Sequence, residues 1–403
     1  MKFNLRVISV VLIALFVATG CKKDKKEEQS QEDAGKELFV SANPLQTLTK
    51  VQLQTAASLM GFGAFSSSLK YDVDFYRFIY NTTFKGRKIQ ASGLLCVPGG
   101  MSGTPAMLSA QHGTIFADFQ APSAFNFPGS MTGFELFAST GFVTVIPDFI
   151  GYGVSKDIIH PYYDMQSSGQ AVVDMIKAAK YYLKSQNKSI SEKLFLIGYS
   201  EGGYVTMAAQ REIETNASHK LTVTAAAEGA GGYDISGMLA TVATKTSYPD
   251  PSFFALFIQN YNTLYGFNRP LTDYFKEPFA SRINTLLDGT LKGDQINAQL
   301  TLSLRDLFNT NFFNSLNSAG AEAAFKAKVA ENSFPNWAPK SATRLYHGTA
   351  DENVYYQTSE STYNRFLPVT GSAKLSLIPI PGGNHGSSVV PMMGDALQWF
   401  STF

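Results

Sequence analysis

Short apolar segments separated mostly by helix-length segments constrain the fold of this chain more than any other feature. The apolar segments cover residues 106–110, 142–146, 194–197, 221–227, 343–346 and 375–380. Runs of this kind are typical of strands that are buried on both faces of a parallel sheet. One separating segment, residues 169–185, carries an apolar stripe at helical spacing. The alternation predicts right-handed βαβ crossovers and a doubly wound, mostly parallel α/β sheet, with ligand chemistry at the carboxyl ends of its strands.

Composition and charge exclude several classes of protein. The 403 residues are 44% hydrophobic and only 16% charged, which excludes disorder as the main state. Lys and Arg total 33 against 32 Asp and Glu, so the net charge of +1 creates no overall field to hold nucleic acid. The two cysteines, Cys21 and Cys96, are too few for a disulfide framework or a zinc cluster.

Residues 1–20 have the pattern of an export signal, because two basic residues precede the apolar run 7–18 and small residues then lead to Cys21. The residues before Cys21 resemble the lipobox of Gram-negative lipoproteins, which implies that Cys21 becomes the lipidated N-terminus. We therefore expect an exported lipoprotein of the outer membrane, on its periplasmic face or at the cell surface, with residues 21–40 as a charged flexible tether. The alternatives are a plain cleaved signal peptide or a short membrane anchor, although a comfortable span needs about twenty apolar residues.

Beyond the tether, two β-rich runs at residues 71–84 and 87–97 predict an antiparallel hairpin. Later in the chain, about a hundred residues separate two of the apolar segments, which is too long for a crossover. We expect an inserted helical cap, or lid, at residues 233–339, which divides the α/β core into residues 41–232 and 340–403. The aromatic residues of this insert either form its own small core or, for a minority, face a substrate cleft. They include Phe253, Phe254, Phe257, Tyr261, Tyr265, Phe308, Phe312 and Phe313.

A Gly-x-Ser-x-Gly pattern carries the strongest chemical signal. Ser200 lies between Gly198 and Gly202, directly after the predicted strand 194–197 and before the helix-like segment 204–215. Glycines two positions before and after a serine let the backbone turn sharply where a Cβ would clash. This context predicts a nucleophile elbow, which presents the Ser200 hydroxyl at the edge of the sheet.

A serine nucleophile needs a base, and after an elbow the base comes last in the order Ser, Asp or Glu, His. The chain has five histidines, of which His219, His347 and His385 follow Ser200. His385 lies in a glycine-rich loop after the final predicted strand, from which it can reach Ser200, so we predict that it is the base. His347 is expected to support its loop, and His219 to be a surface residue.

The base in turn needs a carboxylate that orients its ring. Asp351 follows the penultimate predicted strand and fits this position. Glu352 and Glu228 are the alternative candidates for this acid. The other interpretation of Asp351 is that it only forms hydrogen bonds that stabilise a turn.

Taken together, Ser200, Asp351 and His385 in this order resemble the catalytic triad of the α/β-hydrolase superfamily. The resemblance covers nearly the whole chain from about residue 70, and it implies an oxyanion hole built from two backbone amides. One is the amide after the nucleophile, here Glu201. The other comes from the loop after the third strand of that fold, here residues 109–114, so the second donor is the amide of Thr114 or Gly113. On this view His112 is a structural residue of that loop.

A finer resemblance rests on residues 147–153, which are followed by His160-Pro161-Tyr162 and later by the Ser200 elbow. These segments are similar to the secreted lipase and esterase group of the superfamily, although the disulfides of that group are absent. Asp148 and Asp157 are expected to brace loops rather than to take part in catalysis.

The sequence therefore predicts a serine carboxylic-ester hydrolase that acts through an acyl-enzyme on small-molecule or lipid-like esters. No metal and no organic cofactor is required, no nucleic acid is bound, and the membrane is reached through the N-terminal lipid. Two alternatives stay open. One is a serine peptidase of the prolyl-oligopeptidase type, and the other is a non-catalytic ligand-binding lipoprotein.

Overall fold

The computed structural model describes residues 31–403. The predicted export signal, the lipidation site at Cys21 and residues 21–30 of the predicted tether lie outside the described residues. Within residues 31–403, no helix combines the length and the hydropathy that a membrane crossing requires.

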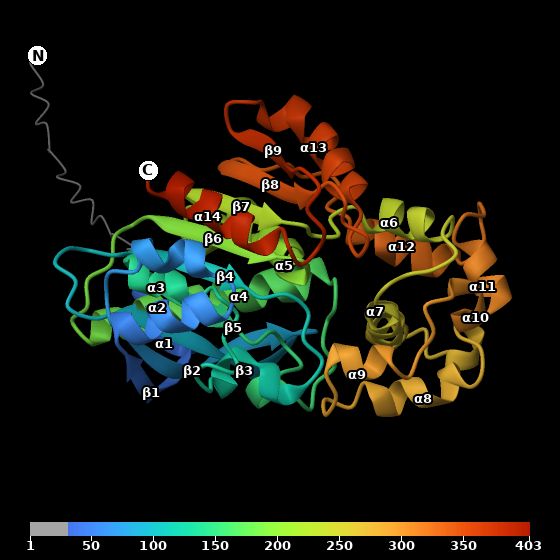
Figure 1. Ribbon diagram of the computed structural model, residues 1–403, viewed down its shortest axis with the longest axis horizontal. Coiled ribbons are helices and arrows are strands. Elements are labelled where there is room, and N and C mark those ends of the chain that lie inside the picture. The colour runs from blue at the N-terminus through green and yellow to red at the C-terminus, as the bar shows by residue number, and fades with distance from the viewer. Residues whose placement is uncertain (1–30) are drawn as a thin grey trace, which may run out of the picture.

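A nine-stranded sheet runs through the molecule in the order β1-β2-β3-β5-β4-β6-β7-β8-β9 (Figure 1). Strands β1, β2, β3 and β5 pair antiparallel in succession, and all pairs from β5/β4 to β8/β9 are parallel. This arrangement confirms the predicted hairpin and the predicted doubly wound α/β sheet. The strands are β1 Phe39–Leu48, β2 Val73–Phe84, β3 Arg87–Pro98, β4 Ala106–Gln111, β5 Phe142–Pro147, β6 Leu194–Tyr199, β7 Ala225–Gly229, β8 Ala342–Gly348 and β9 Leu375–Ile380.

Helices cover both faces of the sheet and bury two apolar clusters against it. Helices α4 and α5 contribute Val172 and Met207 to one cluster, while α3 and α14 contribute Phe137 and Met393 to the other. The Asp164 side chain caps α4 by accepting a hydrogen bond from the Ser167 amide at 2.8 Å. The core helices are α1 Gln31–Leu38, α2 Lys50–Leu59, α3 Leu136–Thr140, α4 Met165–Ser185, α5 Glu201–Thr215, α13 Tyr356–Thr370 and α14 Val389–Phe400.

The structure differs from the sequence prediction at residues 31–40, where a flexible tether was expected. Residues 31–38 form α1, and Phe39 begins β1, which pairs with β2 at the edge of the sheet. The ring of Phe39 stacks on Tyr182 of α4 at a centroid distance of 5.3 Å and lies 5.6 Å from the ring of Phe78. Strand pairing and the packing of one aromatic ring therefore hold this segment on the core. The polar composition of the segment gives no sign of either interaction.

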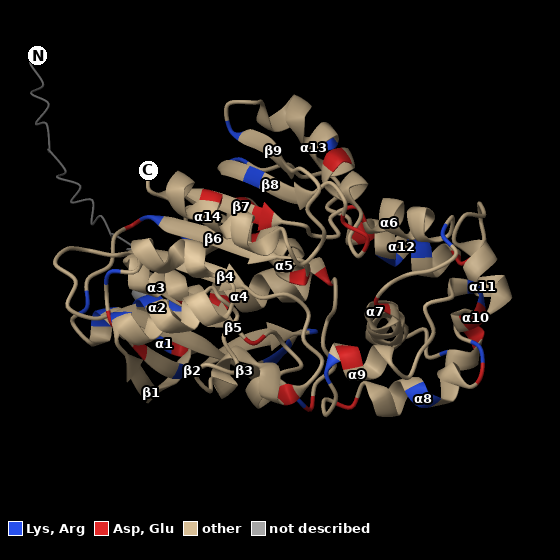
Figure 2. Cartoon of the chain, in the orientation of Figure 1, with Lys and Arg blue, Asp and Glu red and all other residues tan. Residues whose placement is uncertain are grey.

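Between β7 and β8 the chain forms a group of helices that lies beside the sheet, on the right in Figure 1. Its buried residues belong to the same apolar cluster as those of α4 and α5. In Figure 2, Lys and Arg are interspersed with Asp and Glu over both the sheet and this insert. The helices of the insert are α6 Ile235–Val242, α7 Pro251–Leu264, α8 Phe279–Leu286, α9 Gly293–Asn297, α10 Leu304–Leu307, α11 Thr310–Ser315 and α12 Ala323–Glu331.

Candidate active site

Ser200 stands at the turn between β6 and α5 with backbone angles φ 60° and ψ −126°. A positive φ in a residue that is not glycine is a strained conformation, which persists only where the surroundings enforce it. A Cβ on Gly202 would overlap the carbonyl oxygen of Gln111, and a Cβ on Gly198 would overlap that of Gly202. The sharp turn therefore requires both glycines, as the sequence pattern indicates.

The structure brings Ser200, His385 and Asp351 together at the carboxyl ends of β6, β8 and β9. The Ser200 Oγ lies 2.9 Å from His385 Nε2, and His385 Nδ1 lies 2.7 Å from Asp351 Oδ2. Ser200 and Asp351 are buried, whereas the His385 side chain is 17% exposed and lies in the loop after β9. These contacts form the nucleophile, base and acid geometry of a serine hydrolase.

Asp351 is held as a carboxylate by its neighbours. Burial alone would raise the pKa of Asp351, but hydrogen bonds with His347 and His385 outweigh burial and hold this pKa well below its usual range. Its Oδ1 accepts hydrogen bonds from the amides of Asn353 and Val354, both at 2.9 Å. Asp351 is therefore ionised at neutral pH and can orient the protonated Nδ1 of His385.

The predicted oxyanion donors lie in the loop after β4 and at the start of α5. Gly113 lies beside the nucleophile, because a Cβ on Gly113 would be 3.7 Å from the Cβ of Ser200. Among residues 31–403, the amides of Gly113, Thr114 and Glu201 donate to no protein acceptor. Glu201 is the first residue of α5, where an amide has no partner within the helix. All three amides are thus available to a substrate oxygen.

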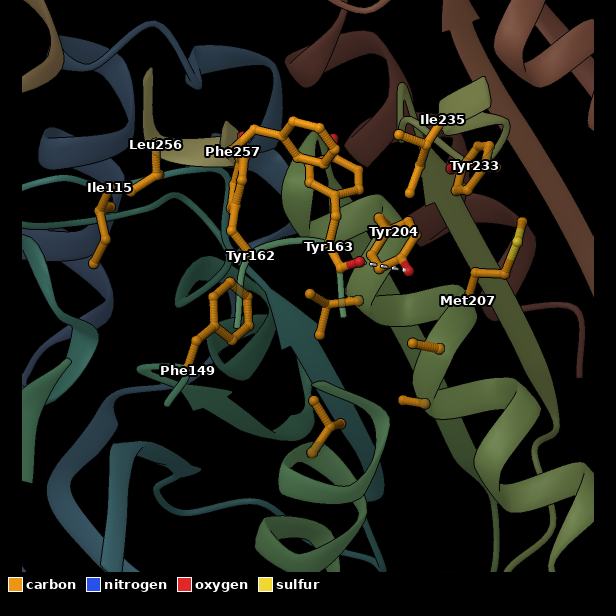
Figure 3. Close-up of a cluster of buried hydrophobic side chains, with 14 of the residues drawn as sticks. Ile115, Phe149, Tyr162, Tyr163, Tyr204, Met207, Tyr233, Ile235, Leu256 and Phe257 are labelled. Carbon is orange, nitrogen blue, oxygen red and sulfur yellow. Dashed lines mark hydrogen bonds between the residues drawn. The ribbon is translucent and has the colours of Figure 1, made fainter. Parts of the chain in front are cut away.

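An apolar pocket opens over Ser200, and its empty space, open solvent included, is about 470 Å³. The insert supplies much of its wall from α6 and α7, and Tyr162 and Tyr163 of the core complete it. Figure 3 shows Phe257 of α7 beside Tyr162 and Tyr163, with Ile235 of α6 nearby. The lining residues are Tyr162, Tyr163, Ser200, Ile235, Met238, Leu239, Tyr248, Phe253, Phe254, Phe257 and Val354.

The aromatic residues of the insert divide between the two roles expected for them. Phe253, Phe254 and Phe257 line the pocket over Ser200. Phe308 and Phe313, in contrast, stack on each other inside the insert at a centroid distance of 5.7 Å. These three pocket-facing phenylalanines belong to α7, whereas Phe308 and Phe313 follow later in the chain.

The remaining histidines serve as structural residues. His347 is fully buried and binds the Ser359 hydroxyl and the Val354 carbonyl, both at 2.7 Å, so it supports the loop that carries Asp351. His219 was expected at the surface, and this prediction is wrong. It is only 5% exposed, and its Nε2 lies 2.7 Å from Glu212 Oε1. Glu212 lies seven residues earlier, in the last turn of α5.

The other acidic candidates take different places. Asp148 is fully buried and accepts hydrogen bonds from the Ser92 hydroxyl at 2.5 Å and the Ser123 amide at 2.7 Å, as expected for a loop brace. Asp157 is exposed and forms no hydrogen bond or ion pair with any residue that the structure describes, so it braces nothing there. Glu228 is buried within β7, and Glu352 is exposed.

Sequence reasoning missed a link between the insert and the loop of Asp351. Tyr248 donates a hydrogen bond to the Asn353 carbonyl at 2.8 Å, and the Asn353 side-chain amide donates to Asp250. The backbone amide of the same Asn353 binds Asp351. A second missed contact runs from the Tyr199 hydroxyl to the His385 carbonyl at 2.6 Å. Neither contact has a signal in the sequence, because each joins residues that are far apart along the chain.

Within residues 31–403, no cluster of three or more His, Cys, Asp or Glu side chains is placed to hold a metal ion.

Comparisons with known proteins identify a family through one family model and the fold through solved structures. A family model described as "Secretory lipase" matches residues 130–402. A putative hydrolase from Legionella pneumophila is 23% identical with a TM-score of 0.83, and the match covers 91% of this chain and 98% of that chain.

The rice cell wall degrading esterase LipA from Xanthomonas oryzae is also 23% identical, with a TM-score of 0.79 and coverage of 91% and 97%. The closed state of Candida antarctica lipase A is 18% identical, with a TM-score of 0.64 and coverage of 91% and 83%. A search of curated proteins found no match.

Proposed function

Because the chain belongs to the secretory lipase family and is an ester hydrolase of the lipase and esterase type, we propose that it cleaves carboxylic esters through a Ser200 acyl-enzyme. The observation that carries this proposal is the pair of contacts of His385, at 2.9 Å to Ser200 and 2.7 Å to Asp351, beside an apolar pocket.

In this mechanism His385 Nε2 takes the Ser200 proton while Oγ attacks the ester carbonyl carbon. Asp351 accepts the Nδ1 proton of His385 in a hydrogen bond and stabilises the imidazolium. The amides of Glu201 and of Thr114 or Gly113 stabilise the oxyanion. The imidazolium then protonates the leaving alcohol, and the neutral ring activates the water that releases the acid.

The walls of the pocket indicate which part of the substrate is apolar. Almost every lining residue is apolar or aromatic, and Ser200 lies at the same surface. Burying a methylene contributes about 0.8 kcal/mol, so a longer acyl chain gains binding energy there until the pocket is filled. We therefore propose the inserted helices as a cap that selects esters with an apolar acyl group.

The decisive experiment combines labelling and substitution of Ser200. A fluorophosphonate probe is expected to label wild-type protein at Ser200 and to leave folded Ser200→Ala unlabelled. Hydrolysis of p-nitrophenyl esters by this variant should fall by about four to six orders of magnitude. Retained hydrolysis in folded Ser200→Ala would overturn the serine mechanism.

Two further outcomes separate the other candidate functions. Prolyl amides cleaved faster than aryl esters would favour a peptidase of the prolyl-oligopeptidase type. Folded wild-type protein that neither reacts with the probe nor hydrolyses any ester would favour a ligand-binding lipoprotein.

We also propose that the enzyme is exported and attached to the outer membrane through Cys21. Membership of a secretory lipase family supports export, and the residues before Cys21 support lipidation. One acyl chain anchors a protein only marginally, so stable attachment needs the several chains of the lipoprotein pathway. Cys21→Ser should release the protein from the membrane fraction or block its maturation. Unchanged processing and membrane association of that variant would refute the lipobox interpretation.

A further inference from the structure

A second histidine and carboxylate pair includes the residue next to Ser200 in the chain and has no place in the triad. His160 Nε2 lies 2.8 Å from Glu201 Oε1, and both side chains are at least nine-tenths buried. Glu201 follows Ser200 in the chain, and its backbone amide is one of the proposed oxyanion donors. The pair therefore joins the loop after β5 to the oxyanion hole.

The hydrogen bonds of His160 determine how many protons the pair holds. Its Nδ1 lies 2.7 Å from the Ile150 carbonyl oxygen, which can only accept, so Nδ1 carries a hydrogen. One further proton lies between Nε2 and Glu201 Oε1. Whether that proton belongs to the ring or to the carboxyl group, the pair as a whole is neutral.

The Glu201 carboxyl group has no hydrogen-bond partner other than His160 among residues 31–403. Its second oxygen, Oε2, is buried and has no hydrogen-bond partner among residues 31–403. An unpaired carboxylate at this point would lie one side-chain length from the oxyanion that forms during ester cleavage. In a partly buried site two such negative charges repel each other strongly enough to slow the reaction about ten- to a hundredfold.

We propose that His160 is a positioning residue that keeps Glu201 neutralised and fixed beside the oxyanion hole. This inference rests on the proposed ester hydrolysis and assigns it one more residue. His160 itself is held among aromatic rings, because its ring centroid lies 5.0 Å from Tyr152 and 5.6 Å from Tyr162. Phe149 lies parallel to it at 6.3 Å, and Figure 3 shows Phe149 below Tyr162.

Other ionisable groups surround the pair. His112 interacts electrostatically with Glu201, but neither His112 nor Asp148 forms a hydrogen bond with the pair. A polar pocket borders His160 on the insert side, and its charged residues are mostly exposed. The ionisable residues facing the pair are His112, Asp148, Tyr152, Tyr162 and Tyr163, and those sharing the polar pocket with His160 are Asp118, Lys156, Asp157 and Asp288.

The test measures the pH profile of kcat for His160→Gln with a p-nitrophenyl ester. Wild-type kcat should rise as the base loses its proton and then reach a plateau. A buried carboxyl group without a cation keeps its proton to higher pH than an exposed one. In His160→Gln, kcat should therefore reach a maximum and then fall about tenfold or more towards pH 9, as Glu201 becomes an unpaired carboxylate.

Two variants distinguish charge from packing. The double variant His160→Gln/Glu201→Gln removes the charge together with its partner, so the plateau at high pH should return. His219→Gln is the matched control, because His219 forms the same kind of contact with Glu212 at 2.7 Å and neither residue lines the pocket. Its pH profile should keep the wild-type shape.

A descending limb in His160→Gln that the double variant abolishes would support the inference. An equal loss of kcat at every pH, or a descending limb that persists in the double variant, would overturn it. If His160→Gln does not fold, the double variant alone tests the inference. A kcat of the double variant that is more than a hundredfold below wild type at every pH would show that charge neutralisation is not the role of His160. Activity in Ser200→Ala would instead overturn the proposed function, so the two failures are distinguishable.

Discussion

The α/β core and the helical insert contribute to the same pocket through different parts of the chain. The core contributes Ser200, Asp351 and His385 from turns at strand ends, where backbone geometry places each polar group. The insert contributes apolar side chains from α6 and α7, where a side chain lines the pocket if it lies on the face of the helix that is turned towards Ser200. The proposed chemistry therefore depends on local backbone turns, whereas the proposed substrate selection depends on how the helices of the insert pack.

The largest expected effect separates two histidines of the core. His385→Ala removes the base and should lower kcat by about four to six orders of magnitude, with the fold retained. His347→Ala should keep kcat within about tenfold but lower the free energy of unfolding by about 2–4 kcal/mol, because it leaves buried partners unpaired. Ester assays and urea unfolding measure the two effects, and an exchange of the two phenotypes would show that the assignment of the base is wrong.

The next effect concerns the link between the two regions. Asp250→Ala removes the acceptor for the Asn353 side chain and should lower kcat about tenfold, because the loop of Asp351 then loses its contact with the insert. Asp273→Ala is the control, since Asp273 also lies in the insert but its side chain pairs, among residues 31–403, only with the partly exposed Arg269. Steady-state kinetics of the two variants decide the matter, and equal values of kcat would mean that the insert does not position the acid.

A smaller effect should appear in substrate choice. Phe253→Ala enlarges the pocket wall and should flatten the gain with acyl length, which is about three- to fourfold in kcat/KM per buried methylene when realised in the transition state. Phe267 of the insert is also partly buried but lies outside the pocket, so Phe267→Ala should keep the wild-type profile. A wild-type enzyme whose efficiency falls from acetate onwards would instead indicate a small-acyl esterase that acts on bulky alcohols.

The smallest effect tests the N-terminal segment of the core. Phe39→Ala should lower the free energy of unfolding by about 1–2 kcal/mol without changing kcat, because its ring packs against Phe78 and Tyr182. Val40, the next residue, is 38% exposed, and Val40→Ala should change stability by less than about 0.5 kcal/mol. Equal stabilities of the two variants would restore the interpretation of residues 31–40 as a tether.

The elbow could be predicted because it depends on a short stretch of chain, in which a Cβ at Gly198 or Gly202 would overlap backbone atoms. The order Ser200, Asp351, His385 could be predicted because it is the order typical of the α/β-hydrolase fold. The tether prediction failed at residues 31–40 for the opposite reason. Polar composition describes how a segment interacts with water, but β1 is held by pairing with β2 and by one aromatic ring.

The alternating α/β architecture and the sharp turn at Ser200 can be predicted from the amino-acid sequence, because hydrophobic periodicity and backbone sterics act over a few residues. The order of Ser200, Asp351 and His385 along the chain can be read from the sequence and compared with the α/β-hydrolase pattern. The three-dimensional packing was needed to show that His219 is buried, that α7 faces the pocket, that Asn353 joins the insert to Asp351, and that His160 contacts Glu201. Each of these is a contact between residues separated along the chain, and its energy depends on distances that packing alone sets.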